Sequence, residues 1–246
     1  MEQLIYGIHP VRECLRSGAR PVSCLFVARD AGSPGLKAIL QLARRRGYAI
    51  RFEPRNLLDQ RVGGANHQGV VAVCAARPYV ELEDLLDGLG AAPLVVALDS
   101  VEDPRNLGAV LRCCAAAGVD GVIVTKDHAA GVSATVSKAA AGGLEYLSIA
   151  RVSNLARAID RLKTKGIWVA GVETGQPLGC QDLDLTVATA LVLGNEGAGL
   201  RRLVREKCDF LASIPTPGPI RSLNVSVAAG IVLYEAIRQR RRSQSN

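Results

Sequence analysis

The stretch PLVVALDSVEDPRNLGAVLRCCAAAGVDGVIV, residues 93–124, contains two continuous apolar runs with a helical pattern between them. Asp103 followed by Pro104 is typical of a helix N-cap and first helical position, and Gly118 is a typical stop. Strands that are apolar throughout are typical of a parallel sheet with both faces covered. The stretch therefore predicts a strand, a helix and a second strand of such a sheet. The i, i+3, i+4, i+7 spacing predicts the buried stripe of the helix: Leu107, Val110, Leu111 and Cys114.

The rest of the chain repeats this alternation and predicts an α/β fold in two domains. In the carboxyl-terminal part we expect a last helix at about 222–240 and further strands at 167–172, 190–194 and 210–214. The first third predicts a smaller α/β unit, with helices at 10–17 and 35–46 and strands at 22–28, 48–53 and 69–76. Residues 79–92, an acidic stretch with two glycines that lies between Pro78 and Pro93, are interpreted as a linker that carries a short helix. The predicted domains are 1–78 and 93–246.

Composition excludes several classes of protein. The chain of 246 residues is 48% hydrophobic, its longest apolar run is AAPLVVAL, and its first residues do not have the pattern of a secretory leader. We therefore expect a cytosolic protein. The three histidines, His9, His67 and His128, are scattered, so no metal is predicted. Neither zinc spacing nor a disulfide pattern joins the seven cysteines, at positions 14, 24, 74, 113, 114, 180 and 208.

The net charge of +7 is concentrated in the first third of the chain. Residues 1–78 contain 12 Lys and Arg against 5 Asp and Glu, whereas residues 79–246 contain 18 of each class. Such asymmetry is typical of a surface that binds a polyanion, and a merely solvated basic surface is the alternative.

Three polar clusters are candidates for a functional site. Asn106 is expected in the first helical turn, beside the carboxyl end of a strand, where open α/β sheets bind ligands. Arg112 lies further along the same helix. Glu196 stands between glycines in LVLGNEGAGL, residues 191–200, and Ser222 and Asn224 stand where the last helix begins. The alternatives are helix caps, a solvent-exposed charge and an ordinary tight turn. The chain has no GxGxxG pattern, which disfavours a dinucleotide oxidoreductase.

Together these clusters resemble the three motifs of the SpoU (TrmH) family of RNA ribose methyltransferases, within the SPOUT class. The matching segments are DPRNLGAVLR (103–112), LVLGNEGAGL (191–200) and SIP (213–215) followed by SLNVSVAAGI (222–231). LIYGIHPVRECL (4–15) and NHQGVVAV (66–73) resemble the two ends of the family's RNA-recognition domain, which is related to ribosomal protein L30e. The resemblance thus covers nearly the whole chain, although residues 126–145 match only loosely.

The resemblance implies a fold and an activity. The fold would be an L30e-like α/β domain, followed by a SPOUT domain whose parallel sheet ends in a trefoil knot. The enzyme would be a homodimer that uses S-adenosylmethionine. The arrangement most resembles bacterial members that methylate the ribose 2'-oxygen of a guanosine in the peptidyl-transferase P loop of 23S rRNA. A methyltransferase that acts on tRNA and a non-catalytic RNA-binding protein are the alternatives.

The resemblance also assigns roles to residues of this chain. The backbone around Gly194, Ile214 and Leu223 would hold the cofactor. The polar groups around the target ribose would be Asn106, Arg112, Glu196, Ser222 and Asn224. Because an arginine stays protonated, Arg112 is expected to grip a phosphate or to stabilise developing negative charge, and its role stays open. The rRNA substrate would be contacted by basic residues of the first third: Arg12, Arg16, Arg20, Arg44, Arg45 and Arg46.

Overall fold

The computed structural model describes residues 2–127, 129–195 and 197–243. The chain forms two compact units. One contains the residues up to Pro78 together with Val132–Tyr146, and the other contains Tyr79–Gly131 and the residues from Leu147 onward. Each unit is described here by itself.

The first unit is built on a four-stranded mixed sheet in the order β1-β4-β2-β3. Strand β4 is antiparallel to both of its neighbours, and β2 is parallel to β3. Alternate residues of β2 enter two apolar clusters on opposite faces, with Leu25 on one and Phe26 on the other. The elements are β1 (Glu2–Tyr6), α1 (Ile8–Ser17), β2 (Val22–Ala28), α2 (Pro34–Arg45), β3 (Ile50–Glu53), α3 (Arg55–Arg61), β4 (Val70–Ala75), α6 (Ala134–Ala139) and the 3-10 helix η1 (Gly143–Tyr146).

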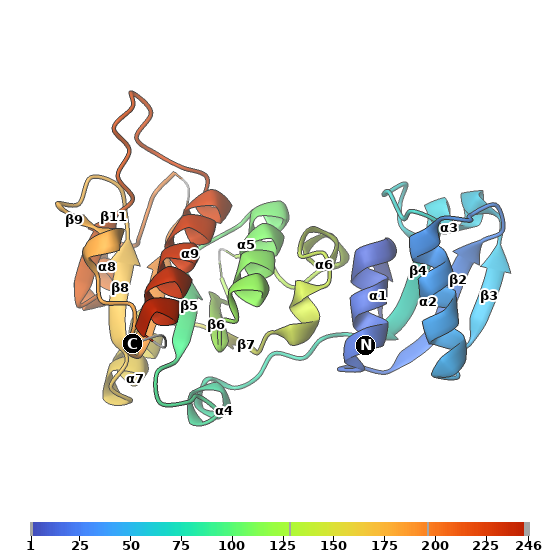
Figure 1. Cartoon of the computed structure of the whole chain (residues 1–246), viewed down its shortest axis with the longest axis horizontal. Coiled ribbons are helices and arrows are strands. Elements are labelled where there is room, and N and C mark those ends of the chain that lie inside the picture. Colours follow the sequence, from blue (N-terminus) through green and yellow to red (C-terminus); the bar gives the residue numbers. More distant parts are fainter. Residues whose placement is uncertain (1, 128, 196, 244–246) are drawn as a thin grey trace. The chain divides into compact units, whose positions relative to one another are not determined.

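The second unit is built on a seven-stranded sheet in the order β7-β6-β5-β10-β8-β11-β9, and every strand pair is parallel (Figure 1). This confirms the predicted α/β fold with a parallel sheet. The elements are α4 (Leu82–Asp87), β5 (Leu94–Leu98), α5 (Pro104–Ala117), β6 (Gly121–Thr125), β7 (Ile149–Val152), α7 (Leu155–Thr164), β8 (Trp168–Val172), β9 (Leu178–Gly179), η2 (Cys180–Asp182), β10 (Thr189–Leu193), α8 (Arg202–Lys207), β11 (Phe210–Ser213) and α9 (Val225–Ser243).

Helices cover both faces of this parallel sheet. Every residue of β5, β6 and β10 is buried. Val95 and Ala97 pack in a cluster with apolar residues of α4, α7 and α8. Their neighbours Leu94, Val96 and Leu98 point to the opposite face because side chains alternate along a strand. That face is covered by α5 and α9, which pack against each other and lie side by side in Figure 1.

Helix α5 begins and ends as the sequence predicts. The Asp103 side chain accepts a hydrogen bond from the backbone N–H of Arg105, and Pro104 is the first helical residue. Gly118 ends the helix in the left-handed conformation. The predicted apolar stripe is buried in full: Leu107, Val110, Leu111 and Cys114.

The chain is divided differently from the predicted domains in two places. Residues 79–92 are part of the second unit and not a separate linker, because Leu85 and Leu86 of α4 are buried in its core. Residues 132–146 belong to the first unit, although they lie within the range expected for the second. A short helix with an apolar face is stable only where other residues cover that face. Each of these two segments therefore belongs to the unit against which it packs.

Two further findings concern the cysteines and membrane-spanning helices. All seven cysteines are free thiols. In the described ranges, no helix is both long enough and apolar enough to cross a bilayer.

Candidate functional site

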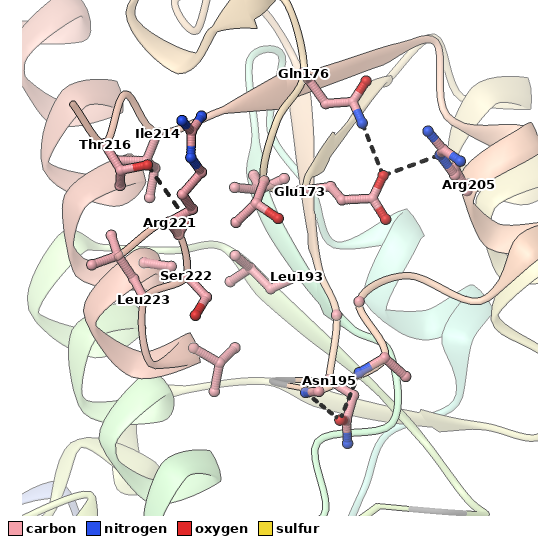
Figure 2. A pocket seen from close by; sticks show the side chains of 18 residues that line it. Glu173, Gln176, Leu193, Asn195, Arg205, Ile214, Thr216, Arg221, Ser222 and Leu223 are labelled. Atoms are coloured by element: carbon pink, nitrogen blue, oxygen red, sulfur yellow. Dashed lines mark hydrogen bonds and ion pairs between the residues drawn. The ribbon is translucent and has the colours of Figure 1, made fainter. Parts of the chain in front are cut away.

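A cavity of about 500 Å³ lies at the carboxyl edge of the second unit's sheet (Figure 2). Parallel strands deliver their carboxyl ends to one edge, and here the strands β8, β10 and β11 end at Val172, Leu193 and Ser213. The segments that follow β8, β10 and β11 line the cavity. This is the position at which open α/β sheets bind ligands, and the volume is in the usual range for small-molecule sites.

The loop after β10 forms one wall of the cavity, and its shape requires glycine at position 194. A Cβ atom on Gly194 would lie only 2.3 Å from the backbone carbon of Gly199. The backbones meet because Asn195 and Gly199 exchange two hydrogen bonds, of 3.1 and 2.9 Å. Gly199 itself has φ of +68°, which favours glycine. Glycine at position 194 thus allows two parts of the same loop to come into contact.

Asn195 and Asp99 fix this loop to the end of β5. The Asn195 side chain donates to the backbone oxygen of Ser100 (2.9 Å) and accepts from the N–H of Gly197 (2.9 Å). Asp99 is fully buried and accepts from both the backbone N–H of Arg201 (2.8 Å) and its guanidinium Nε (2.6 Å). The loop is therefore braced at both ends. Sequence reasoning did not single out either residue.

The loop between β11 and α9 forms a second wall. Ile214, Ser222 and Leu223 all line the cavity. Helix α9 begins at Val225 rather than near 222, because Asn224 acts as its cap: the Asn224 Oδ1 atom accepts from the N–H of Ser226 at 2.9 Å. Ser222 and Leu223 are thus in the preceding loop, where their backbone groups are free of helical hydrogen bonding.

A hydrogen bond joins the first and third motifs. The Asn224 Nδ2 atom donates to the Oδ1 atom of Asn106 at 3.1 Å, which places the start of α5 against the start of α9. Arg112 is exposed on α5, and no ion pair is found for it within the described part of the chain. Glu196 lies outside the described residues. The structure thus gathers Gly194, Ile214, Ser222 and Leu223 around the cavity and couples Asn106 to Asn224.

Comparison with known proteins assigns the chain to a family. Residues 93–234 match the family described as "SpoU rRNA Methylase family", which is more than half of the chain. The chain belongs to the SpoU rRNA methylase family. Residues 4–80 match a second family description, "RNA 2'-O ribose methyltransferase substrate binding". The resemblance inferred from the three sequence motifs is thereby confirmed.

Two curated relatives and one solved structure illustrate this SpoU membership. The 23S rRNA (guanosine-2'-O-)-methyltransferase RlmB of Xylella fastidiosa (strain 9a5c) is 45% identical over 97% of both chains. RlmB of Pseudomonas aeruginosa is 44% identical over 96% of both chains. The SpoU methyltransferase AviRb of Streptomyces viridochromogenes, solved in complex with AdoMet, superposes with a TM-score of 0.83 at 30% identity and covers 98% of this chain and 91% of its own.

One of the six arginines that the SpoU resemblance suggested for RNA contact is misassigned. Arg20 is only 3% exposed, and its guanidinium binds both carboxylate oxygens of Glu145 and the Gln3 Oε1 atom (2.9 Å). Burial alone would lower the pKa of Arg20, but the hydrogen bonds and the charge of Glu145 raise it, so the guanidinium stays charged. Arg20 is a structural residue that ties the segment 132–146 to the first unit.

The other five arginines are accessible to different degrees. Arg44, Arg45 and Arg46 are exposed at the end of α2. The side chain of Arg16 is 61% exposed, whereas that of Arg12 is 36% exposed and binds Glu13 at 2.9 Å. Among the described residues, no group of three His, Cys, Asp or Glu side chains could hold a metal ion.

Proposed function

We propose that this chain transfers a methyl group from S-adenosylmethionine to the ribose 2'-oxygen of a guanosine in the peptidyl-transferase P loop of 23S rRNA, in ribosome biogenesis. The observation that carries the proposal is the convergence of the second and third SpoU motifs on one cavity. Gly194 comes from the loop after β10, and Ile214 and Leu223 come from the segment after β11. The full-length similarity to RlmB favours a 23S rRNA guanosine over tRNA.

The cavity fits the adenosine part of the cofactor. Leu193, Ile214, Leu223 and Val225 supply apolar contacts, and the backbone of Gly194 and of residues 222–223, which lie outside helices and strands, offers donors and acceptors. A purine needs this combination of apolar surface and in-plane hydrogen bonds. The residues proposed to hold the cofactor are therefore Gly194, Ile214 and Leu223.

The residues proposed to act on the ribose must position it and manage one proton. S-adenosylmethionine supplies an electrophilic methyl group bound to a sulfonium, so in-line placement of the 2'-oxygen supplies much of the rate enhancement. Asn106, Ser222 and Asn224 are proposed to hold the ribose through hydrogen bonds. Arg112, which stays protonated, is proposed to bind the adjacent phosphate and to stabilise negative charge on the 2'-oxygen. Glu196 is proposed as an acceptor at the same site.

The first unit is proposed to recognise the rRNA. Its four-stranded α/β sheet and the match of residues 4–80 to a substrate-binding family support an L30e-like RNA-recognition domain. The exposed cluster Arg44, Arg45 and Arg46 supports binding to phosphates. Arg12 and Arg16 are weaker candidates because both are close to Glu13.

We also propose a homodimer and a carboxyl-terminal trefoil knot. The homodimer is supported by an exposed apolar stripe on α9, formed by Val227, Ile231 and Tyr234. The knot is supported by the strand order: β10 lies between β5 and β8, and the chain passes beyond β8 to β11 before it returns to place α9 on α5. A cytoplasmic location follows from the proposed rRNA substrate.

The deciding experiment is transfer of labelled methyl from S-adenosylmethionine to unmodified 23S rRNA and, in parallel, to bulk tRNA. The modified nucleotide is located by its resistance to alkaline cleavage. We expect a single protected guanosine in the P loop. Label on tRNA alone would contradict 23S rRNA as the substrate but would still support methyl transfer as the reaction. Label on neither RNA, with cofactor binding retained or absent, would favour a non-catalytic RNA-binding protein.

A further inference from the structure

Glu173 lies on the wall of the cavity and belongs to none of the three SpoU motifs. It follows Val172, the last residue of β8, so its side chain starts from the carboxyl edge of the sheet. The side chain is 20% exposed. Figure 2 shows its carboxylate pointing toward Gln176 and Arg205, which also line the cavity.

One oxygen of the Glu173 carboxylate is fixed by two partners. The Oε2 atom accepts a hydrogen bond from Gln176 Nε2 at 3.0 Å and forms an ion pair with Arg205 Nε at 3.1 Å. Gln176 comes from the same loop, and Arg205 comes from α8. Two partners on one oxygen hold the carboxylate in one orientation.

The other oxygen, Oε1, lies near Gly199, and both residues line the cavity. It lies 3.1 Å from the position that a Cβ atom on Gly199 would occupy, so a side chain at position 199 would press against this oxygen. No donor within the described residues binds it. A carboxylate oxygen that is partly buried in a cavity gains most from a ligand that donates hydrogen bonds to it.

The charges around Glu173 indicate which donor fits. Arg205 already offsets the charge of the carboxylate, so the pair as a whole is close to neutral. A second cation, such as an ammonium group, would be repelled by Arg205, whereas a neutral hydroxyl would not. Neutral hydroxyl groups are therefore the donors that fit this oxygen, which can accept from one or two of them.

We propose that Glu173 Oε1 accepts hydrogen bonds from the ribose hydroxyls of the cofactor's adenosine. The inference rests on the proposed function, since it assigns a specific contact within the same cavity. Glu173 then contributes to cofactor affinity and leaves the methyl-transfer step itself unchanged. Arg205 and Gln176 act through Glu173 as positioning residues.

A double-mutant cycle between protein and ligand tests this contact. The ligands are S-adenosylhomocysteine and its 2',3'-dideoxy analogue, the proteins are the wild type and Glu173→Ala, and the dissociation constants come from calorimetry. In the wild type, removal of the hydroxyls is expected to weaken binding by roughly tenfold, the size of one hydrogen bond to a charged group. In Glu173→Ala the two ligands should bind equally, both at the weakened level. The matched control is Glu206→Ala, an exposed glutamate of α8 that pairs with Arg202 and does not line the cavity.

The outcomes separate the inference from the proposed function. If the wild type binds S-adenosylhomocysteine and both proteins lose the same affinity on removal of the hydroxyls, Glu173 does not contact the ribose and the inference is overturned. If the wild type does not bind S-adenosylhomocysteine at all, the proposed function falls with it. Steady-state kinetics give a second readout: Glu173→Ala should raise KM for S-adenosylmethionine and leave kcat unchanged, and a fall in kcat alone would contradict the assignment.

Discussion

The backbone of Gly194 is in close contact with the backbone of Gly199. A substitution that adds one methyl group at position 194 therefore tests whether this contact shapes the cofactor site. In Gly194→Ala the new Cβ atom would lie 2.3 Å from the backbone of Gly199, which cannot move aside as a flexible side chain can. The loop must shift, so we expect cofactor affinity to fall by at least about tenfold and stability to fall by about 1–3 kcal/mol. Calorimetry with S-adenosylhomocysteine and urea unfolding measure the two effects.

Gly218 provides the matched control for this substitution. It lies in the loop between β11 and α9, and a Cβ atom there would meet nothing within 4 Å. Gly218→Ala should bind S-adenosylhomocysteine as the wild type does. Equal behaviour of the two variants would mean that the close approach at Gly194 does not shape the cofactor site.

Asn106 and Arg112 are predicted to be needed for transfer and dispensable for cofactor binding. Asn106 is bonded to Asn224 and Arg112 is exposed on α5, and neither residue lines the cavity. Asn106→Ala and Arg112→Ala should each lower kcat by on the order of a hundredfold or more, as does loss of a group that stabilises transition-state charge. The dissociation constant for S-adenosylhomocysteine should stay within about threefold. Transfer at the normal rate by either variant would remove that residue from the site, and Arg202→Ala on α8 is the control for loss of an exposed arginine.

At the scale of elements, the segment 132–146 is held to the first unit by a buried ion pair. The side chains of Arg20 and Glu145 are each only 1% exposed. Glu145→Gln would leave a buried guanidinium without its counter-charge, so we expect a loss of about 3–5 kcal/mol in unfolding free energy. Faster hydrogen exchange of residues 132–146 is the local measurement that accompanies it.

Two further variants decide whether burial explains that effect. Glu53→Gln breaks an ion pair of the same type with Arg61, whose side chain is 38% exposed, and should cost less than about 1 kcal/mol. The double variant Arg20→Met with Glu145→Leu removes both charges and should recover most of the stability. A loss from Glu145→Gln no larger than that from Glu53→Gln would show that the segment is held by other contacts.

The sequence predicts best the elements whose signals are local. Helix α5 has its cap, its proline, its apolar stripe and its stop within residues 103–118, and all four are confirmed. Strand β1 was not predicted, because its place at the edge of the sheet comes from pairing with β4, almost seventy residues away. Packing also decides where 79–92 and 132–146 belong. A local sequence pattern does not indicate which distant segment of the chain will pack against an apolar face.

The candidate site likewise contains residues that the sequence predicted and residues that it did not. Gly194, Ile214, Ser222 and Leu223 were identified through their motifs, and the structure places them around one cavity. Glu173 was missed, although it follows a correctly predicted apolar strand and the rule applied to Asn106 would have pointed to it. Arg20 was misassigned because a charge count cannot distinguish a surface arginine from one that is paired and buried.

At the scale of the whole molecule, the excess positive charge of residues 1–78 should be visible in the salt dependence of RNA binding. Charge reversal at Arg44, Arg45 and Arg46 should weaken affinity for 23S rRNA fragments and reduce the slope of log K against log salt, because fewer counterions are released. Filter binding at several salt concentrations measures the slope, and cofactor affinity should not change. A control reversed at the exposed residues Arg157, Arg161 and Lys165 changes the total charge equally. The same slope in both reversed proteins would mean that total charge, and not this cluster, sets the affinity.

The apolar stripe on α9 is the feature that most directly concerns assembly. One side of this helix is buried through Ala229, Val232 and Leu233, whereas Ile231 is 39% and Tyr234 is 69% exposed. Val227, Ile231 and Tyr234 recur at i, i+4 and i+7, so they form a single face that a second copy of the chain would cover.

Ile231→Asp should therefore convert the proposed homodimer into a monomer, because the dimer would have to bury an unpaired carboxylate. Light scattering coupled to size exclusion at several protein concentrations gives the mass of each variant. Leu203→Asp is the matched control, since Leu203 is 55% exposed on α8 and lies outside the stripe, and this variant should remain dimeric. A dimeric Ile231→Asp would place the interface elsewhere on the molecule, and a monomeric wild type would contradict the homodimer itself.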